Sequence, residues 1–463
     1  MGRFCPKQIA LKAVLLAFEE QVFRESAQMK HIKSPIVDAV AEDTKTRGLV
    51  TEMLARIREG GEEAVRNYAK TLDGWEGEFV LSDEKREALI SQVPQQAKED
   101  IQFAHRQIKR FAEAQRASLT DFSLDTEPGV TLGQKCVPVD AAGCYVPGGR
   151  YAHVASALMS VTTARAAGVP FVIAASPPRG DAIDPAVCYA MHLAGADVIL
   201  EMGGVQAVAS MAFGLFGTRP ADILVGPGNA FVAEAKRQLF GGVGIDLFAG
   251  PTESAVIADE TADPMTVAID LLSQAEHGVN SPVWLFTTSP KLAETVGRII
   301  PKVAADWPTG EVAMISWRDY GEIVLCDDRE QMAEVSDKYA CEHLQVQAED
   351  LAWWRDRLRN YGSLFLGEGS TVSHGDKCSG TNHILPTRQA ARYTGGLNVM
   401  KFLKTLTWQE LRTDADPQMS EVGSRLSRLE GMDGHARACD WRLQKFSGRN
   451  SFDFEVAQQE RYD

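Results

Sequence analysis

Two short polar motifs in the 463-residue chain bring together side chains that could do chemistry. Gln274 and His277 are three residues apart. On a helix this spacing points both side chains from one face, where they could bind one metal ion. Glu342 and His343 are adjacent and offer a carboxylate and an imidazole for proton transfer. Because such pairs are also common as helix caps or surface groups, neither establishes a site alone.

Further polar groups lie in loops toward the C-terminus. Asp376 lies in the glycine-containing segment 373–377, and residues 379–387 form a proline-bounded loop of small, amide and imidazole side chains. Loops of this kind commonly carry ligand-binding groups. Glu430 and His435 flank a further glycine-containing turn.

These groups include a set of zinc ligands: Gln274, His277, Asp376 and His435 would supply two nitrogen and two oxygen atoms. The gaps between them are too long for spacing to establish the set.

The elements that must position these residues follow an α/β pattern. Residues 51–69 and 83–116 have apolar side chains at helical spacing. From about residue 129, short β-rich runs alternate with alanine-rich helical stretches, and glycine or proline marks the joins. The predicted strands of this first series are 136–139, 171–174, 198–200 and 223–225. Such alternation predicts βαβ units around a parallel sheet.

A second α/β series follows, with a helix at 264–277. Its predicted strands are 254–257, 283–286, 322–325 and 363–366. From about residue 386 to the end the sequence is helical and charged. We therefore predict two Rossmann-like α/β domains with parallel-rich sheets and small helical elements at both ends. The predicted parts are an N-terminal helical arm at 1–35, a first domain from 36–131 and 253–385, a second from 132–252, and a tail domain at 386–463.

Composition narrows the class of protein. The formal charge of −15 argues against nucleic-acid binding, which needs a basic surface. No segment reaches the roughly 18 uninterrupted apolar residues of a membrane helix. The eight cysteines are scattered without CxxC spacing, which indicates reduced thiols in a cytoplasmic protein.

A dinucleotide fingerprint is missing from the sequence. No G-x-G-x-x-G run follows a predicted strand and opens a helix. The glycine turns at 146–150 and 225–229 could still present backbone N–H groups to a pyrophosphate. Local spacing alone therefore does not predict NAD.

At these residues the chain closely resembles the histidinol dehydrogenase superfamily. The resemblance covers roughly Arg47 to Arg442, with several blocks in the family's order. The matching blocks are Tyr145–Gly149, Gly203–Ala207, Gly226–Phe231, Ala249–Glu253, Gln274–His277, Glu342–Leu344, Ser379–His383 and Glu430–His435.

The resemblance implies a role for each group. Zinc would be held by Gln274, His277, Asp376 and His435, and NAD contacted by Tyr145, Gln206 and Asn229. His343 would take the alcohol proton, and Glu342 would activate water for a second oxidation. Thr252, His383 and Glu430 fall at substrate positions. The resemblance also implies a homodimer that exchanges its terminal elements, so that His435 and Glu430 reach the partner's site.

The resemblance implies a small polar alcohol as substrate, and departures from the histidinol pattern bear on which one. Arg150, His153, His374 and Lys377 could add positive charge near the site, although each could equally be a solvated surface group. The combination resembles the superfamily branch that oxidises 2,3-dihydroxypropane-1-sulfonate to 3-sulfolactate with zinc and two NAD. A sulfonate needs cationic or N–H partners. Lys377 and Arg150 are the leading candidates.

Two alternatives stay open. Glu430 suits an imidazole N–H, which favours oxidation of histidinol to histidine. A non-catalytic metal-binding scaffold is the remote alternative, and the acid/base pair Glu342–His343 argues against it.

Overall fold

The structure, a computed structural model, describes residues 30–36, 44–148, 152–248 and 250–449. Its contacts divide the chain into two units. The first unit comprises Met1–Arg116 and Val139–Phe402, and the second comprises Ala117–Pro138 and Leu403–Asp463.

The first unit contains a six-stranded sheet in the order β1-β11-β10-β9-β12-β13. All neighbours are parallel except β1, which pairs antiparallel with β11. The strands are β1 (Lys30–Lys33), β9 (Ser254–Ala258), β10 (Val283–Thr287), β11 (Glu322–Leu325), β12 (His343–Gln347) and β13 (Ser363–Leu366).

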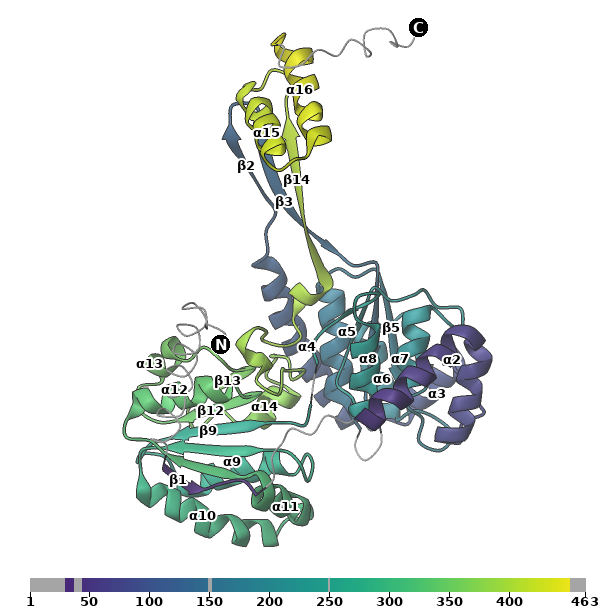
Figure 1. Ribbon diagram of the computed structural model, residues 1–463. Helices are drawn as coiled ribbons and strands as arrows, with labels where there is room; N and C mark the ends of the chain where they lie inside the picture. The colour runs from purple at the N-terminus through teal and green to yellow at the C-terminus, as the bar shows by residue number, and fades with distance from the viewer. Residues whose placement is uncertain (1–29, 37–43, 149–151, 249, 450–463) are drawn as a thin grey trace, which may run out of the picture. The chain divides into compact units, whose positions relative to one another are not determined.

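Helices cover both faces of this sheet (Figure 1). On one face lie α9 (Pro264–Ala275), α10 (Pro290–Ala305) and α11 (Gly310–Tyr320), and on the other lie α12 (Arg329–Tyr339) and α13 (Leu351–Arg357). The middle strand β9, with the sequence SAVIA, is buried throughout, as expected of a parallel strand covered on both faces. Local signals start α9: the Asp263 carboxylate accepts from the Thr266 N–H, and Pro264 follows.

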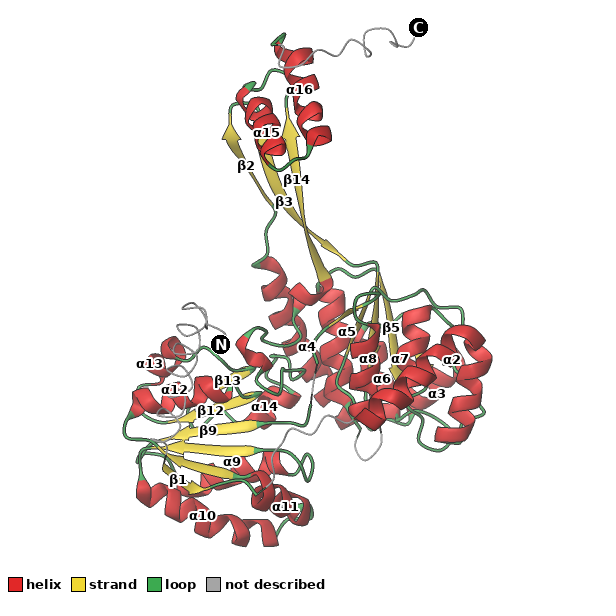
Figure 2. Cartoon of the chain, viewed as in Figure 1, coloured by secondary structure: helices red, strands yellow, loops and turns green. Residues whose placement is uncertain are grey.

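A second, five-stranded parallel sheet has the order β6-β5-β4-β7-β8. Its strands are β4 (Ala141–Tyr145), β5 (Phe171–Ser176), β6 (Val198–Glu201), β7 (Ile223–Val225) and β8 (Gly244–Ile245). The remaining α-helices of the first unit are α2 (Thr44–Tyr68), α3 (Asp83–Ser91), α4 (Gln95–Ala117), α5 (Val154–Ala166), α6 (Pro185–Ala194), α7 (Gly204–Phe213), α8 (Ala230–Leu239) and α14 (Val372–Lys377). Figure 2 shows the strands of both sheets among these helices. The predicted α/β class with two parallel-rich sheets is confirmed.

The second unit is a three-stranded antiparallel sheet with two helices. The sheet order is β14-β3-β2, formed by β14 (Leu403–Leu411), β3 (Val130–Pro138) and β2 (Phe122–Glu127). Helices α15 (Gln418–Leu429) and α16 (Asp433–Ser447) pack together. The buried Asp440 carboxylate accepts from Arg428 at 2.5 Å and joins the two helices.

The structure groups three segments differently from the sequence prediction. Helix α2, predicted in the first domain with 253–385, packs on α7 and α8, because its apolar stripe, including Val50 and Ile57, joins the core of the five-stranded sheet. The run 136–139 ends antiparallel strand β3, so the parallel sheet starts instead at β4. The predicted tail 386–463 contains strand β14, whose pairing with β3 overrides its charged, helical composition.

The N-terminal arm is tested only in part. Residues 1–29 lie outside the described residues. The end of the predicted helical arm is strand β1, because its backbone pairs with the edge strand β11. No helix in the described part of the chain is long and apolar enough to span a membrane.

Candidate active site

A cluster of buried ionisable side chains lies at the amino ends of the central strands of the six-stranded sheet. Glu253 directly precedes β9, Glu342 directly precedes β12, and His343 is the first residue of β12. The register pairs His343 with Ser254 and Ser363, so the starts of the three strands lie level. The fold therefore brings Glu342 and His343 to one edge of the sheet, with Glu253 beside them.

The His343 imidazole lies among three acidic residues. Its Nε2 is 3.5 Å from Asp376 Oδ1, and its Nδ1 is 3.7 Å from Glu342 Oε2. Nδ1 also lies 3.3 Å from the Glu253 carbonyl oxygen, which can only accept, so this nitrogen carries a proton. Nε2 has no hydrogen-bond partner among the described residues and faces the Asp376 carboxylate.

Burial and charge shift the pKa values of this cluster. Burial lowers the pKa of His343, but the neighbouring carboxylates, Glu342 first, raise it more, and it rests at about 9. Burial raises the pKa of Glu342 to about 8 and that of Glu253 to about 7. Burial also disfavours the Asp376 carboxylate, but the ion pair with the His343 imidazolium outweighs this and holds its pKa well below the usual range. Burial thus disfavours ionisation of the two glutamates, whereas the Asp376 carboxylate stays ionised beside His343.

The predicted metal ligands of the first unit have free donor atoms. Gln274 is 2% exposed, and its Oε1 has no hydrogen-bond partner in the described part of the chain. His277 Nδ1 lies 3.1 Å from the Gln274 carbonyl oxygen and donates to it, which leaves Nε2 as a possible ligand. Burial lowers the pKa of His277, which favours the neutral, metal-binding form. With Asp376 ionised, one nitrogen and two oxygen donors of the first unit suit zinc.

The remaining predicted ligand belongs to the second unit. His435 is exposed in the first turn of α16, and Glu430 is exposed at the end of α15. The described residues contain no group of three or more His, Cys, Asp or Glu side chains able to hold a metal.

The predicted NAD residues gather at the carboxyl ends of the five-stranded sheet. Tyr145 ends β4, and its hydroxyl accepts from the Gly204 N–H at 3.1 Å at the start of α7. Gln206 donates to Asp73 at 2.6 Å, and Asn229 caps α8 by accepting from two backbone N–H groups at 3.1 Å. The strand order reverses between β4 and β7, where nucleotides bind in open α/β sheets.

The glycine turn after β7 approaches β4 closely. A Cβ atom at Gly226 would lie 2.0 Å from the Tyr145 carbonyl oxygen, and its φ of 115° excludes other residues. A buried ion pair fixes the turn: Lys236 Nζ donates to the Gly226 carbonyl at 2.8 Å, and its partner Asp246 accepts from the Gly226 N–H at 2.8 Å. The turn is therefore rigid before any ligand binds.

Comparisons with known proteins agree with this geometry. A family model described as histidinol dehydrogenase matches residues 38–443. The chain belongs to the histidinol dehydrogenase family. Family members are dehydrogenases that act on alcohol groups with NAD.

Two relatives from Ruegeria pomeroyi and one solved structure are close. A histidinol dehydrogenase homolog is 61% identical over 400 residues, covering 86% of this chain and 92% of the relative. A sulfopropanediol 3-dehydrogenase is 55% identical over 428 residues, covering 92% and 98%. The crystal structure of histidinol dehydrogenase from Elizabethkingia anophelis superposes with a TM-score of 0.83 at 32% identity, covering 90% of this chain and 95% of that chain.

The predicted substrate residues of this family member are spread over several segments. Half-buried His383 lies beside the cluster: its Nδ1 donates to the Asp376 carbonyl at 3.0 Å and its Nε2 is 2.8 Å from Ser156 Oγ of α5. Burial lowers the pKa of His383 to about 4, so the ring is neutral. Thr252 is half-buried just before Glu253, and Lys377 is exposed after Asp376.

The other basic residues proposed to contact a sulfonate differ in their surroundings. Burial, and then the charge of Lys377, lowers the pKa of His153. His374 is exposed on α14. Arg150 lies outside the described residues.

Sequence reasoning missed four residues that shape these sites. Glu253 contacts Glu342, Ser156 contacts His383, and Lys236 and Asp246 fix the glycine turn. Of these four, only Glu253 could have been found from the sequence, because it is the last residue of the family block that contains Thr252. The others become visible only once the chain is folded.

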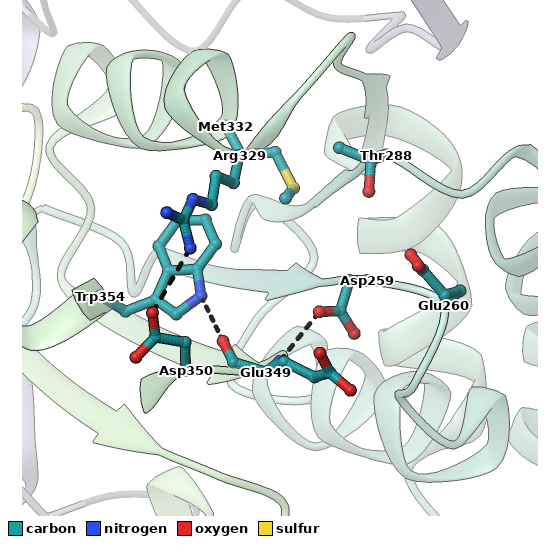
Figure 3. A pocket seen from close by; sticks show the side chains of 8 residues that line it. All are labelled: Asp259, Glu260, Thr288, Arg329, Met332, Glu349, Asp350 and Trp354. Carbon is teal, nitrogen blue, oxygen red and sulfur yellow. Dashed lines mark hydrogen bonds and ion pairs between the residues drawn. The ribbon is translucent and has the colours of Figure 1, made fainter. Parts of the chain in front are cut away.

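A separate cavity of about 390 Å³ lies at the opposite, carboxyl end of the six-stranded sheet (Figure 3). Asp259 and Thr288 follow β9 and β10 directly and line it with Glu349 and Asp350. The Asp259 carboxylate accepts from the backbone N–H of Glu349 at 2.8 Å, and Asp350 pairs with Arg329 at 3.4 Å. Asp259 and Asp350 are thus used in local structure.

Proposed function

We propose that this protein is a zinc-dependent, NAD-linked dehydrogenase that oxidises 2,3-dihydroxypropane-1-sulfonate through the aldehyde to 3-sulfolactate. The observation that carries the substrate is the 55% identity to a sulfopropanediol 3-dehydrogenase along almost the whole of both chains. The buried cluster of His343, Glu342 and Asp376 supplies the chemistry.

The free Nε2 of His343 is the proton acceptor in this proposal. In the structure, Asp376 helps to hold a proton on this imidazole. With its ring neutral, His343 would accept the hydroxyl proton on Nε2 while its Nδ1–H stays bonded to the Glu253 carbonyl oxygen. The C–H electron pair then leaves as hydride for NAD.

Gln274, His277 and Asp376 would hold the zinc, with His435 as the fourth ligand. The unpaired Oε1 of the buried Gln274 supports this assignment, because a buried amide oxygen without a partner is costly unless it binds a ligand. When bound, zinc would polarise the substrate hydroxyl and stabilise its developing negative charge.

Glu342 serves the second oxidation. Its Oε2 accepts from the Glu253 N–H at 3.0 Å, which fixes the carboxyl group beside His343. Water adds to the aldehyde carbon, and one of its protons passes to the Glu342–His343 pair. A second hydride leaves the hydrate for a second NAD, which gives the acid. Retaining the aldehyde in a buried site prevents side reactions.

A sulfonate is anionic and needs cationic or N–H partners. Lys377 directly follows Asp376 and is exposed, and its charge acts on the Asp376 carboxylate, which supports it as a cationic partner for the sulfonate. Arg150 ends the glycine turn after Tyr145 and could contact either the sulfonate or a cofactor phosphate.

L-Histidinol is the second candidate substrate. The chain has Glu430, whose carboxylate could accept from an imidazole N–H, and 32% identity to a histidinol dehydrogenase structure.

We also propose a homodimer in which the second unit of one copy completes the site of the other. The second unit exposes apolar side chains on its sheet, including Phe122 at 51% and Leu411 at 45%, and Leu429 at 83% on α15. Exposed apolar area of this kind favours a partner surface. His435 and Glu430 are exposed at the neighbouring helix ends and remain available to a second copy.

The dimer proposal is tested by mixing two inactive variants. His277→Ala and His435→Ala each remove a ligand, but a heterodimer of the two regains one intact site only if His435 acts across the interface. Recovery of up to about a quarter of wild-type activity after subunit exchange, the share expected from random pairing with one intact site per mixed dimer, supports sharing. No recovery despite exchange, verified by mass, contradicts it.

The substrate is tested by offering 2,3-dihydroxypropane-1-sulfonate and L-histidinol side by side and measuring NADH at 340 nm. The proposal expects NADH from the sulfonate. NADH from histidinol alone assigns the chain to histidinol oxidation, and NADH from neither favours the scaffold alternative.

A further inference from the structure

One face of β12 is polar although the strand lies inside the protein. The strand alternates: Leu344 and Val346 join the apolar core on the side of α12 and α13. His343, Gln345 and Gln347 therefore point to the other side, where they are 3%, 1% and 2% exposed. Central parallel strands are ordinarily apolar on both faces, so two buried glutamines behind the catalytic histidine need an explanation.

Gln345 has no protein partner at all in the described part of the chain. Neither its amide nitrogen nor its amide oxygen makes a hydrogen bond. On the neighbouring strand β9, Ser254 is in register with His343 and lies on the same face, and its fully buried hydroxyl is also unpaired. The Gln347 amide oxygen is unpaired as well. Leaving such groups without a partner in the interior is costly.

The outer end of this row is bonded to helix α9 and reaches toward the surface. Gln347 Nε2 donates to Asp270 Oδ2 at 2.7 Å, and Thr371 Oγ1 donates to Asp270 Oδ1 at 2.9 Å. Asp270 is buried, whereas Thr371 is half-buried at the start of α14. Polar groups thus continue from the catalytic imidazole at the start of β12 to the outside of the sheet layer.

The spacing fits bridging water. Residues two apart on one strand face are separated by about 6.6 Å, too far for a direct bond between short polar groups. One water with two hydrogen bonds of about 2.8 Å joins polar atoms up to about 5.6 Å apart, and the length of the glutamine side chains covers the rest of the spacing. A cation is disfavoured, because the unpaired atoms beside Gln345 are amide and hydroxyl groups without a carboxylate among them.

We propose that Ser254, Gln345 and Gln347 bind a row of internal waters behind His343, and that this row supplies the water that adds to the aldehyde. The role rests on the proposed two-step oxidation; the row itself does not. Because the aldehyde stays bound between the two hydride transfers, the site needs a source of water that does not require the substrate side to open. Gln345 is then a positioning residue that acts through the water it holds.

The test substitutes Gln345→Leu, which keeps the size of the side chain and removes both amide atoms. Val346→Ala is the matched control, because it weakens the same strand on the opposite face. Single-turnover hydride transfer from the alcohol should be unchanged in Gln345→Leu, and KM for the alcohol should stay within about twofold. Oxidation of added aldehyde should slow by about tenfold, the effect of one lost water-mediated bond. Gln345→Asn, which keeps an amide, should recover part of that rate.

Crystal structures of the wild-type and Gln345→Leu holoenzymes give the independent readout. Ordered waters should bridge Gln345 to Ser254 and Gln347 in the wild type and be lost in the variant. Direct protein bonds from the Gln345 amide, with no water, would overturn the proposal. If the waters are present but Gln345→Leu slows both steps equally, the supply role is overturned. It is also overturned if Val346→Ala slows the aldehyde step as selectively as Gln345→Leu does. A wild type that oxidises neither alcohol would overturn the proposed function, while the crystal structures would still decide whether the row exists.

Discussion

The two ends of the six-stranded sheet differ in how their polar groups are satisfied. At the carboxyl end, a cavity is lined by carboxylates, and Asp259 and Asp350 bond to the local backbone or to Arg329. At the amino end, Gln274 Oε1, Glu253 Oε2 and His343 Nε2 are buried with no hydrogen-bond partner in the described part of the chain. Unsatisfied buried donors and acceptors are expensive, so they indicate function more strongly than a hollow does.

The five-stranded sheet makes a second contrast. There the predicted cofactor residues use the carboxyl ends of β4 and β7, the usual ligand-binding edge of such sheets. In the six-stranded sheet, the residues proposed for catalysis lie instead at the amino ends of the strands. The same architecture thus supports two kinds of site, and only the side chains distinguish which edge is used.

Metal removal should have the largest effect on activity, and this effect should involve only the site at the amino end of the sheet. Chelation is expected to abolish turnover, and added zinc to restore it. Gln274→Leu should lower zinc affinity by roughly a hundredfold, measured by titration with a competing chelator. Its apo form should melt no lower than the wild type, because the substitution removes an unpaired buried amide.

The matched control for this prediction is Glu349→Gln in the cavity at the carboxyl end. It should retain zinc and full turnover. Full wild-type activity in protein shown by elemental analysis to contain no metal would refute the zinc assignment.

Substitution of the catalytic pair separates the two oxidation steps. His343→Asn should slow both steps by roughly a hundred- to ten-thousandfold, because each needs a proton acceptor. Glu342→Gln should slow aldehyde oxidation more than alcohol oxidation, measured with each substrate in turn. Equal losses in both steps for Glu342→Gln would contradict separate roles.

Charge next to the proposed metal should determine affinity for the sulfonate. Lys377→Ala should raise KM for the sulfonate about ten- to a hundredfold and leave KM for NAD nearly unchanged, as expected for one lost charge-assisted bond. Arg150→Ala should do the same if it contacts the sulfonate, and the reverse if it contacts cofactor phosphate. If neither variant changes the sulfonate KM, the charge argument fails.

A smaller effect concerns how the stability of the metal-free protein depends on pH. Glu253 has a pKa of about 7 when folded, against an ordinary value of 4.5, so the folded state binds the proton more tightly. The contribution of Glu253 to the free energy of unfolding is therefore most favourable below about pH 4.5. It falls by up to about 3 kcal/mol as the pH rises toward 7.

Urea unfolding at pH 4.5 and 7 checks this sign. Glu253→Gln, which cannot ionise, should show a smaller loss of unfolding free energy over this range than the wild type, while Glu349→Gln should match the wild type. A wild type and Glu253→Gln with the same pH dependence would exclude the proposed shift.

Sequence patterns predicted the strands well where local signals are strong. β11 and β13 have the predicted bounds, and β9 and β10 differ by one residue at their ends, because each is a short apolar run beside a helix. β14 was not predicted, since its charged residues are exposed and only pairing with β3 makes it a strand. The packing of α2 on α7 and α8 is likewise a tertiary choice that apolar spacing does not encode.

The sequence motifs identified Glu342 and His343 as an acid–base pair. Only the fold shows that they lie at the start of strand β12. Spacing could not show that Asp376 lies 3.5 Å from His343, because a helix and a strand lie between them in the sequence. The unpaired state of Gln345 carries no sequence signal, since a glutamine in a strand looks the same whether or not it has a partner. These properties depend on distances across the fold.

The most direct test of the account is the amount of NADH formed when a limiting quantity of 2,3-dihydroxypropane-1-sulfonate is consumed by the zinc-loaded enzyme. The two-step oxidation predicts two NADH and one 3-sulfolactate per sulfonate, with no aldehyde accumulating. One NADH per sulfonate with free aldehyde would contradict the role given to Glu342 and water. No NADH from the sulfonate, with two from each L-histidinol, would contradict the substrate assignment.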